Sequence, residues 1–177
     1  LEQFGKDFTR GQLANLWLEN LPPKYTFGPE RTFLIKAGAE CLGYPTREFE
    51  GTEEQLTRLV NVYNFGSELC GAAIRADAYG YACPGNPELA AELAWRDAGM
   101  THHKTGIYGT MFIAAAIATA MVETDRLEVF NTALRYVPQK SRFYEIVSDC
   151  LEMVDGASDW LEGYNRSHEK YQQYGHC

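Results

Sequence analysis

The stretch that most restricts how this chain can fold is residues 106–122, which contain no charged side chain. Five of these 17 residues are alanine, so the segment is apolar but only weakly lipophilic. A helix needs about 20 predominantly apolar residues to cross a bilayer. The segment falls short of that length. We therefore predict a buried helix at the centre of a globular fold rather than a membrane span.

Hydrophobic residues in the rest of the chain recur with helical spacing, and almost nothing alternates with a period of two. This pattern predicts an all-α protein, a compact orthogonal array of helices around the central alanine-rich helix, without β-strands. A chain of 177 residues can bury the core of one domain, so residues 1–177 are expected to form a single helical domain. Because the chain begins at Leu1 rather than at a methionine, we expect an internal fragment of a larger domain.

Several helix starts can be predicted from capping residues and prolines. Ser, Thr, Asp and Asn are preferred at N-caps, and proline is favoured at the first helical position. The expected starts are Thr9 (a capping box with Gln12), Gly28, Asn86, Asp125 and Ser141. Further helices are predicted over residues 55–64 and 71–81 and from residues 156–158, with a polar loop over residues 44–53.

The overall charge excludes some classes of partner. The chain carries 24 acidic and 16 basic residues, a net charge of −8. Without a lysine–arginine stripe, this balance argues against binding to nucleic-acid phosphates or to an anionic membrane surface. The five cysteines are widely spaced and include no C-x-x-C pair, which fits neither a disulfide framework nor a zinc ribbon. We therefore expect buried, reduced thiols and a cytoplasmic location.

Two segments carry an ordered run of motifs. Residues 66–80 read GSELCGAAIRADAYG, and residues 83–120 begin CPGNPELAAELAWRDAGMTHHKTGIYG and continue into the alanine-rich stretch. This succession of a glycine-containing loop, a Pro-Gly-Asn-Pro-Glu turn, a Thr-His pair and an alanine-rich helix resembles the middle of the ADP-ribosylglycohydrolase family. That family includes the dinitrogenase-reductase-activating glycohydrolases. Residues 5–22 resemble the segment upstream of this core.

The resemblance implies an all-helical hydrolase of ADP-ribosyl linkages, in which two Mg²⁺ ions activate the attacking water. The family holds these ions with an acidic motif near its N-terminus and an Asp-x-Asp-Thr-like motif near its C-terminus. Neither occurs here, since the sequence contains no Asp-Asp, Asp-x-Asp or Asp-Thr step. The resemblance thus implies ADP-ribose or an ADP-ribosylated substrate as ligand, Mg²⁺ ligands outside this chain, and a partner segment or chain that completes the fold.

The ligand-contacting positions are also implied by the resemblance. They are Gly66, Ser67, Glu68, Leu69, Cys70, Gly71, His102, Gly106 and Tyr108. In the family, residues corresponding to 66–71 surround the diphosphate and distal ribose, and the turn at 106–108 lies beside the adenosine. Glycines suit such a loop because they let backbone N–H groups approach phosphate. The chain departs from the family at Cys70, where asparagine is frequent, at Ile74, where methionine is frequent, and at Asp77-Ala78, where Ala-Pro is frequent.

Structural interpretations of the same residues remain open. Gly66 and Gly71 also fit simple helix punctuation. His102 and His103 also fit solvated or capping histidines, which are common. Adjacent side chains point in different directions, which argues against both histidines binding one metal ion. Tyr108 also fits a core or interface position.

Two catalytic interpretations compete with structural ones as well. Asp77 and Asp97 could form an acid pair for glycoside chemistry, but salt bridges with the neighbouring Arg75 and Arg96 are the more economical interpretation. Cys70 would need a nearby base to act as a nucleophile, and the sequence identifies none.

The favoured function is a hydrolase of ADP-ribosyl linkages, represented here by its ADP-ribose-contacting core. The alternative from another class is a non-catalytic helical module that binds a nucleotide or a protein without a metal site. A third possibility is a structural piece that needs a partner chain. An acidic pair upstream of Leu1 and an Asp-x-Asp step downstream of Cys177 in the parent reading frame would favour the enzyme.

Overall fold

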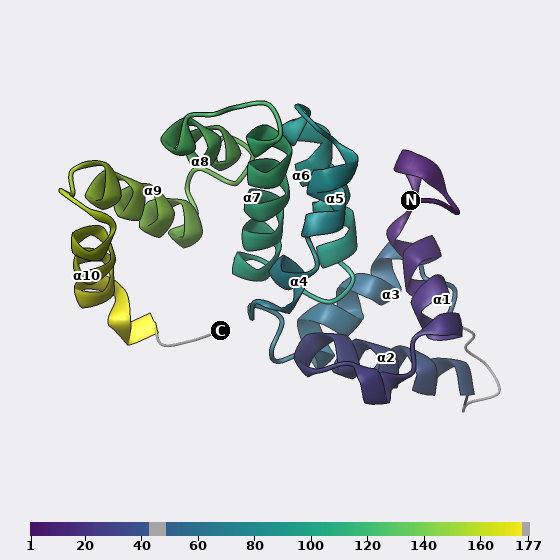
Figure 1. Cartoon of the computed structure of the whole chain (residues 1–177). Helices are drawn as coiled ribbons and strands as arrows, with labels where there is room; N and C mark the ends of the chain where they lie inside the picture. The colour runs from purple at the N-terminus through teal and green to yellow at the C-terminus, as the bar shows by residue number, and fades with distance from the viewer. Residues whose placement is uncertain (43–48, 175–177) are drawn as a thin grey trace.

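The computed structural model describes residues 1–42 and 49–174, which form helices and contain no β-strand (Figure 1). The α-helices of these residues are α1 (Arg10–Asn20), α2 (Gly28–Leu42), α3 (Glu53–Arg58), α4 (Gly71–Ile74), α5 (Asp77–Ala82), α6 (Pro87–Ala98), α7 (Thr105–Ala120), α8 (Arg126–Leu134), α9 (Arg142–Asp155) and α10 (Trp160–Tyr171). Short 3₁₀ turns lie at Gly5–Asp7, Pro23–Tyr25 and Gln172–Tyr174, and a π-helical turn at Leu59–Tyr63. The prediction of an all-α fold is confirmed.

The charge-free segment forms the central helix, as predicted. Helix α7 packs against α4, α5, α6, α8 and α9, and lies in the middle of Figure 1. Its small side chains allow close packing, since Ala114 and Ala118 are fully buried. At Gly80 in α5, an added Cβ would lie 2.6 Å from Cβ of Ile117. Glycine and alanine therefore let these two helices approach more closely than larger residues would permit.

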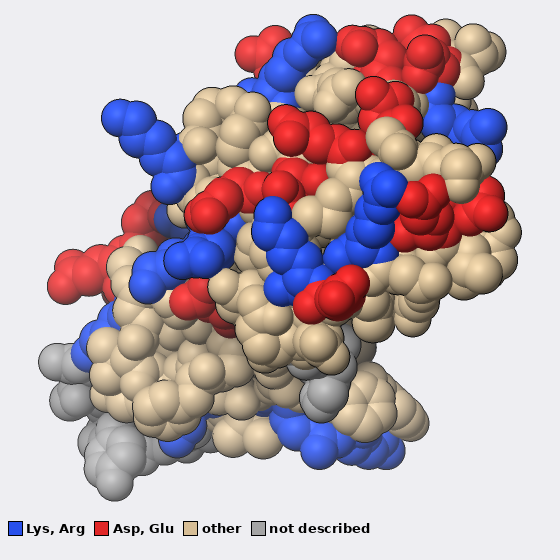
Figure 2. Space-filling model, turned by 90° about the vertical axis from the view of Figure 1, so that its left-hand side faces the viewer, with Lys and Arg blue, Asp and Glu red and all other residues tan. Residues whose placement is uncertain are grey.

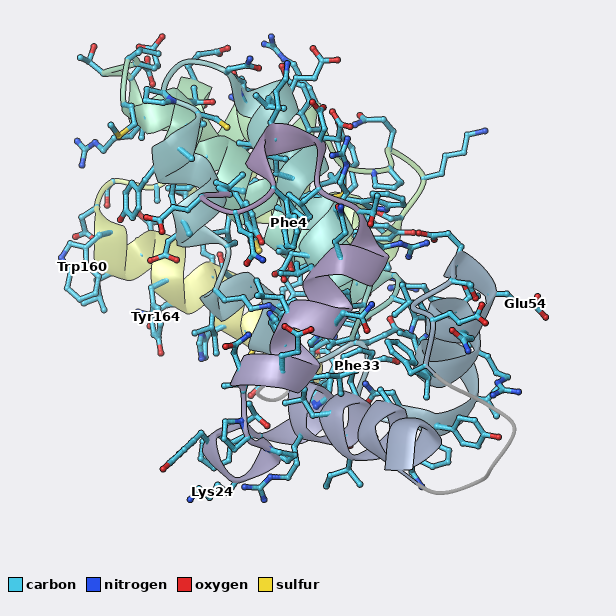
Figure 3. All side chains as sticks on the ribbon, turned by 90° about the vertical axis from the view of Figure 1, so that its right-hand side faces the viewer. Phe4, Lys24, Phe33, Glu54, Trp160 and Tyr164 are labelled. Carbon is cyan, nitrogen blue, oxygen red and sulfur yellow. The ribbon has the colours of Figure 1, made fainter. Side chains whose placement is uncertain are left out.

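The described residues form three hydrophobic clusters. The first joins α5, α6 and α7 with Phe8, and the second joins α1, α2 and α3 with Met100. The third lies between α6, α7, α8 and α9, where the rings of Phe112 and Phe143 meet edge to face with centroids 5.7 Å apart. Figure 3 shows Phe33 of α2, a member of the second cluster, beside α1. Burial of these apolar surfaces is the main favourable contribution to folding.

The predicted capping residues are confirmed where the structure tests them. Thr9 and Gln12 form both hydrogen bonds of a capping box at the start of α1. The side chain of Asn86 accepts a hydrogen bond from the Leu89 amide at the start of α6. The other predicted starts also precede helices: Gly28 begins α2, Asp125 caps α8 and Ser141 caps α9.

Three predicted boundaries are wrong. The helix predicted over 71–81 is broken into α4 and α5, because Arg75 leaves helical geometry and its amide bonds to Ala72 O within a tight turn. The helix predicted over 55–64 begins at Glu53, two residues earlier, because Thr52 caps it. The last helix begins at Trp160 with Asp159 as its cap, rather than within residues 156–158. Of the loop predicted over 44–53, residues 44–48 lie outside the described residues, residues 49–52 are not helical, as predicted, and Glu53 already belongs to α3.

The face that carries α9 and α10 has interspersed charges of both signs (Figure 2). Trp160 and Tyr164 project outward from α10 (Figure 3), and Trp160 is 78% exposed. Among the described residues, no helix combines the length and the apolar character needed to cross a membrane. Cys83 is buried and Cys150 is half-buried, and neither forms a disulfide with a described cysteine.

Candidate functional site

The loop at residues 66–71 lies against the turn between α6 and α7. Two hydrogen bonds between Ser67 and His103 join them. The His103 amide donates to Ser67 O over 2.9 Å, and Ser67 Oγ lies 2.5 Å from His103 Nδ1. Ser67 is only 2% exposed, so this hydroxyl depends on the ring for its hydrogen bond. The structure therefore brings together two segments that are more than thirty residues apart in the sequence.

The contact between the loop at residues 66–71 and the turn before α7 requires glycine at position 106, in the first turn of α7. A Cβ atom at this position would lie 2.7 Å from Ser67 O and 2.8 Å from Cδ2 of His102. Neither neighbour is the free end of a flexible side chain, because one is backbone and the other is a buried ring. The absence of a side chain at Gly106 thus allows the loop to reach the start of α7.

His102 is buried and neutral. Its Nε2 accepts a hydrogen bond of 3.4 Å from the Ala72 amide, and its Nδ1 lies 2.7 Å from Thr101 Oγ1. Burial, with further contributions from the charges of Arg75 and His103, lowers the pKa of His102 to about 3. The 3.8 Å approach of Nε2 to Glu30 is consequently not an ion pair at neutral pH. The interpretation of His102 as a solvated histidine is wrong.

Arg75 is the centre of a buried polar network. Its Nε donates to Asp97 Oδ2 at 2.6 Å and its Nη1 to Glu30 Oε1 at 2.5 Å. Its Nη2 donates to Thr101 Oγ1 at 2.8 Å, and the guanidinium lies over the Trp17 ring, 5.0 Å from the centroid. Burial raises the pKa of Asp97, and pairing with Arg75 opposes that shift.

The charge partners differ from those predicted. Arg75 pairs with Asp97, not with the neighbouring Asp77, which is exposed. Arg96 pairs instead with Glu92, one helical turn away. An acid pair of Asp77 and Asp97 is not formed, because Asp97 is buried against Arg75 while Asp77 faces solvent. Asp97 therefore has a structural salt bridge, but across the fold rather than within α6.

Glu30 lies directly against the end of the loop. An added Cβ at Gly71 would be 2.5 Å from Oε1 and 2.8 Å from Oε2 of Glu30. The carboxylate therefore occupies the space that a side chain at Gly71 would fill. Because the side chain of Glu30 is 14% exposed, it is largely but not completely covered.

Asn64 fixes the beginning of the loop. Its Nδ2 donates to the carbonyls of Pro29 and Thr101, each at 2.9 Å. Its backbone carbonyl accepts from the Ser67 amide. Its Oδ1 is buried and has no hydrogen-bond partner among residues 1–42 and 49–174. The loop is thereby tied to α2 and to the segment after α6.

The remaining predicted site residues have different surroundings. Glu68 is exposed, with Oε1 3.8 Å from His103 Nε2 and 3.9 Å from Lys104 Nζ. Leu69 is exposed, and Cys70 is half-buried at the N-cap of α4. Tyr108 packs against the third hydrophobic cluster, which lies between α6, α7, α8 and α9. Tyr108 is therefore on a core-facing side of α7, and nothing in the described contacts joins it to the loop.

Gly66 begins the loop beside α2. An added Cβ would lie 3.1 Å from Cδ1 of Leu69 and 3.5 Å from Cγ of Pro29. These contacts are less severe than those at Gly71 and Gly106, because the exposed Leu69 side chain can move.

The described carboxylates do not fit a pair of Mg²⁺ ions. Within residues 1–42 and 49–174, no three His, Cys, Asp or Glu side chains are placed to hold one metal ion. The closest buried acids, Glu30 and Asp97, share Arg75 as their counter-charge. A cation there would have to compete with a guanidinium that already satisfies both.

Sequence reasoning missed Glu30, Asn64 and the central role of Arg75. The chain places Glu30 45 residues before Arg75, so no local spacing connects them. A usable signal was the Arg in the middle of a mostly apolar stretch, since a buried arginine requires acidic partners. That signal could not show which acidic residues are the partners of Arg75.

Comparison with known proteins agrees with this arrangement of motifs. A search of curated proteins and a search of solved structures gave no match. The model of one protein family, described as ADP-ribosylglycohydrolase, matches residues 8–176, which is nearly the whole chain. The match includes the loop, Arg75, the two histidines and α7. The chain belongs to the ADP-ribosylglycohydrolase family.

Proposed function

We propose that this chain forms the ADP-ribose-contacting part of a Mg²⁺-dependent hydrolase that cleaves N- or O-glycosidic ADP-ribosyl linkages. Family membership supports the hydrolase class. The observation that carries the proposal is the pair of hydrogen bonds between Ser67 and His103, which joins the loop to the start of α7. ADP-ribose is a long ligand, and a surface built from two segments suits it better than either segment alone.

The proposal assigns no catalytic step to this chain. Metal-activated water is the chemistry that two Mg²⁺ ions supply in such hydrolases, and the described carboxylates do not fit them. We propose that the metal ligands come from a partner segment or chain that completes the domain. The cysteine pattern supports a cytoplasmic location for it.

Substitution of Gly66 tests the ligand site. Gly66→Val should weaken ADP-ribose binding about tenfold, because a branched side chain blocks the approach of the ligand to the loop backbone. Calorimetric titration measures the affinity, and far-UV circular dichroism should be unchanged. Gly38→Val in α2 is the matched control, since a Cβ at Gly38 meets no atom within 4 Å. Equal affinities of Gly66→Val and wild type would contradict the site.

The second candidate is a binding module without hydrolytic activity. It is favoured by the lack of any three described side chains placed to hold a metal ion. Incubation with an ADP-ribosylated peptide and Mg²⁺ distinguishes the candidates. We expect the 177-residue chain to bind the peptide without releasing ADP-ribose, and the parent protein to release it. Release by the 177-residue chain at the rate of the parent would show that its own residues hold the metal, and no release by the parent would leave the binding module.

A further inference from the structure

The carboxylate of Glu30 occupies the side of Gly71 where a phosphate-binding loop would be expected to receive an anion. Both carboxylate oxygens lie within 2.8 Å of the position of a Cβ at Gly71. Oε1 accepts a hydrogen bond from Arg75. Oε2 has no hydrogen-bond partner among the described residues. It is also not one of their fully buried unpartnered atoms, so part of its surface is accessible. One oxygen is therefore held in place and the other can accept a hydrogen bond.

We propose that Glu30 determines which part of the ligand lies at Gly71, by accepting a hydrogen bond from a sugar hydroxyl and excluding a phosphate. This inference rests on the proposed ADP-ribose site and specifies the orientation of the ligand within it. A carboxylate accepts hydrogen bonds from vicinal hydroxyls of ribose, whereas it repels a phosphate oxygen at the same distance.

The loop backbone supports the same orientation. A phosphate needs several donors at once, but the Ser67 amide donates to Asn64 O and the Leu69 amide donates to Gly66 O. The Ala72 amide, the next beyond Gly71, donates to the His102 ring. Three amides of this region are thus already used within the protein. These three amides therefore do not donate to a phosphate, whereas Glu30 places an acceptor at the Gly71 end of the loop.

The charge of Arg75 does not reverse this preference. Its guanidinium donates to Glu30, Asp97 and Thr101 and lies over Trp17, so its charge is shared between two carboxylates. With His102 neutral, Arg75 supplies the positive charge beside Gly71, and it is already paired with the carboxyl groups of Glu30 and Asp97. A neutral hydroxyl is accommodated there more readily than a second anion.

The test compares two ligands that differ in the distal sugar. Calorimetric titration of the 177-residue chain with ADP-ribose and with ADP compares a distal sugar with a terminal phosphate, which carries additional negative charge. We expect wild type to bind ADP-ribose about tenfold or more tightly than ADP, since a hydrogen bond to a charged acceptor contributes that much. Glu30→Gln should reduce this ratio of affinities to near one, mainly by weakening the binding of ADP-ribose. Glu54→Gln is the matched control, because Glu54 is an exposed acid of α3 and is not one of the predicted ligand-contacting residues; its ratio should stay at the wild-type value.

Each outcome distinguishes the inference from the function on which it rests. If wild type binds neither ligand, the proposed site itself is wrong, and the inference with it. If both ligands bind wild type with equal affinity, no sugar hydroxyl is bound at Gly71. If Glu30→Gln binds ADP more tightly and ADP-ribose no less tightly, a phosphate lies there. Either result overturns only the inference. Thermal melting checks that Glu30→Gln is folded. If Glu30→Gln is unfolded, wild type is titrated instead with ADP-ribose and with an analogue that lacks the 2-hydroxyl of the distal ribose. Loss of that hydroxyl should weaken binding by the same factor of about ten or more.

Discussion

The hydroxyl of Ser67 lies 2.5 Å from Nδ1 of His103, a residue 36 positions later in the chain. A backbone hydrogen bond between the same two residues accompanies it. The pair holds the candidate loop against the turn that leads into α7. Because Ser67 is buried while the ring of His103 remains partly exposed, the contact connects the core to a surface that a ligand can reach.

Removal of either side chain should cost a similar amount of stability. Ser67→Ala and His103→Ala should each lower the free energy of unfolding by about 1 kcal/mol, and the double variant by less than the sum. Urea denaturation of the four proteins measures the coupling. Ser148→Ala is the control, because Ser148 only bonds to carbonyls of its own helix. Additive effects of the two substitutions would show that the hydroxyl and the ring do not interact in solution.

Two glycines of α7 should respond oppositely to alanine. Gly106→Ala should destabilise the protein by about 1–3 kcal/mol, because the new Cβ collides with Ser67 O and the His102 ring. Gly109→Ala should be neutral or stabilise by up to about 1 kcal/mol, because its nearest neighbours are 3.6 and 3.9 Å away and alanine favours the helix. Thermal unfolding of both variants makes the comparison. A similar change in both melting temperatures would mean that the loop does not approach Gly106.

Loss of the Arg75 side chain should be severe. Arg75→Met leaves the buried Asp97 without its counter-charge and should lower the free energy of unfolding by about 3–5 kcal/mol. Arg135→Met should cost about 1 kcal/mol or less, since Arg135 is exposed and pairs with the exposed Glu128. Denaturant titration measures the free energy of unfolding of both variants. Equal losses would contradict the assignment of Arg75 as the centre of the network.

The neutral His102 predicts a loss of stability in acid. The pKa of His102 is about 3 in the folded protein and near 6.5 in the unfolded chain, so between these values only the unfolded chain binds the proton. The free energy of unfolding should therefore fall as the pH is lowered from 6.5 towards 3, by up to about 1.4 kcal/mol per pH unit. The raised pKa of Asp97 acts in the opposite direction.

His102→Gln isolates this contribution. Glutamine can accept the Ala72 hydrogen bond but does not titrate, so the variant should lose stability less steeply between pH 6 and pH 4. Urea denaturation at several pH values gives both slopes. Parallel slopes for wild type and His102→Gln would show that the ring is protonated in the folded protein.

Local signals of the sequence predicted much of the fold. Thr9, Asn86, Asp125 and Ser141 cap helices as expected, because a capping side chain bonds to amides two or three residues away. The central position of α7 followed from its lack of charge. The family also followed from the order of motifs along the chain. The ligand-binding roles assigned to the nine candidate residues stay predictions.

Contacts between distant segments were decided only by the tertiary structure. The helix predicted over 71–81 breaks at Arg75, whose side chain reaches Glu30, Asp97 and Thr101 on other elements. Tyr108 lies on the core-facing side of α7, although its position beside Gly106 and His102 in sequence suggested one common site.

The physical reason for this division is the range of the interactions. Capping, helical periodicity and glycine conformation act within a few residues, so the sequence alone predicted most of the helix starts, the order of the helices and the family. The position of the Glu30 carboxylate at Gly71 and the proton state of His102 depend mainly on burial and on residues more than twenty positions away, such as Arg75 for His102. Only packing brings those groups together, and only the tertiary structure could decide what the loop presents to a ligand.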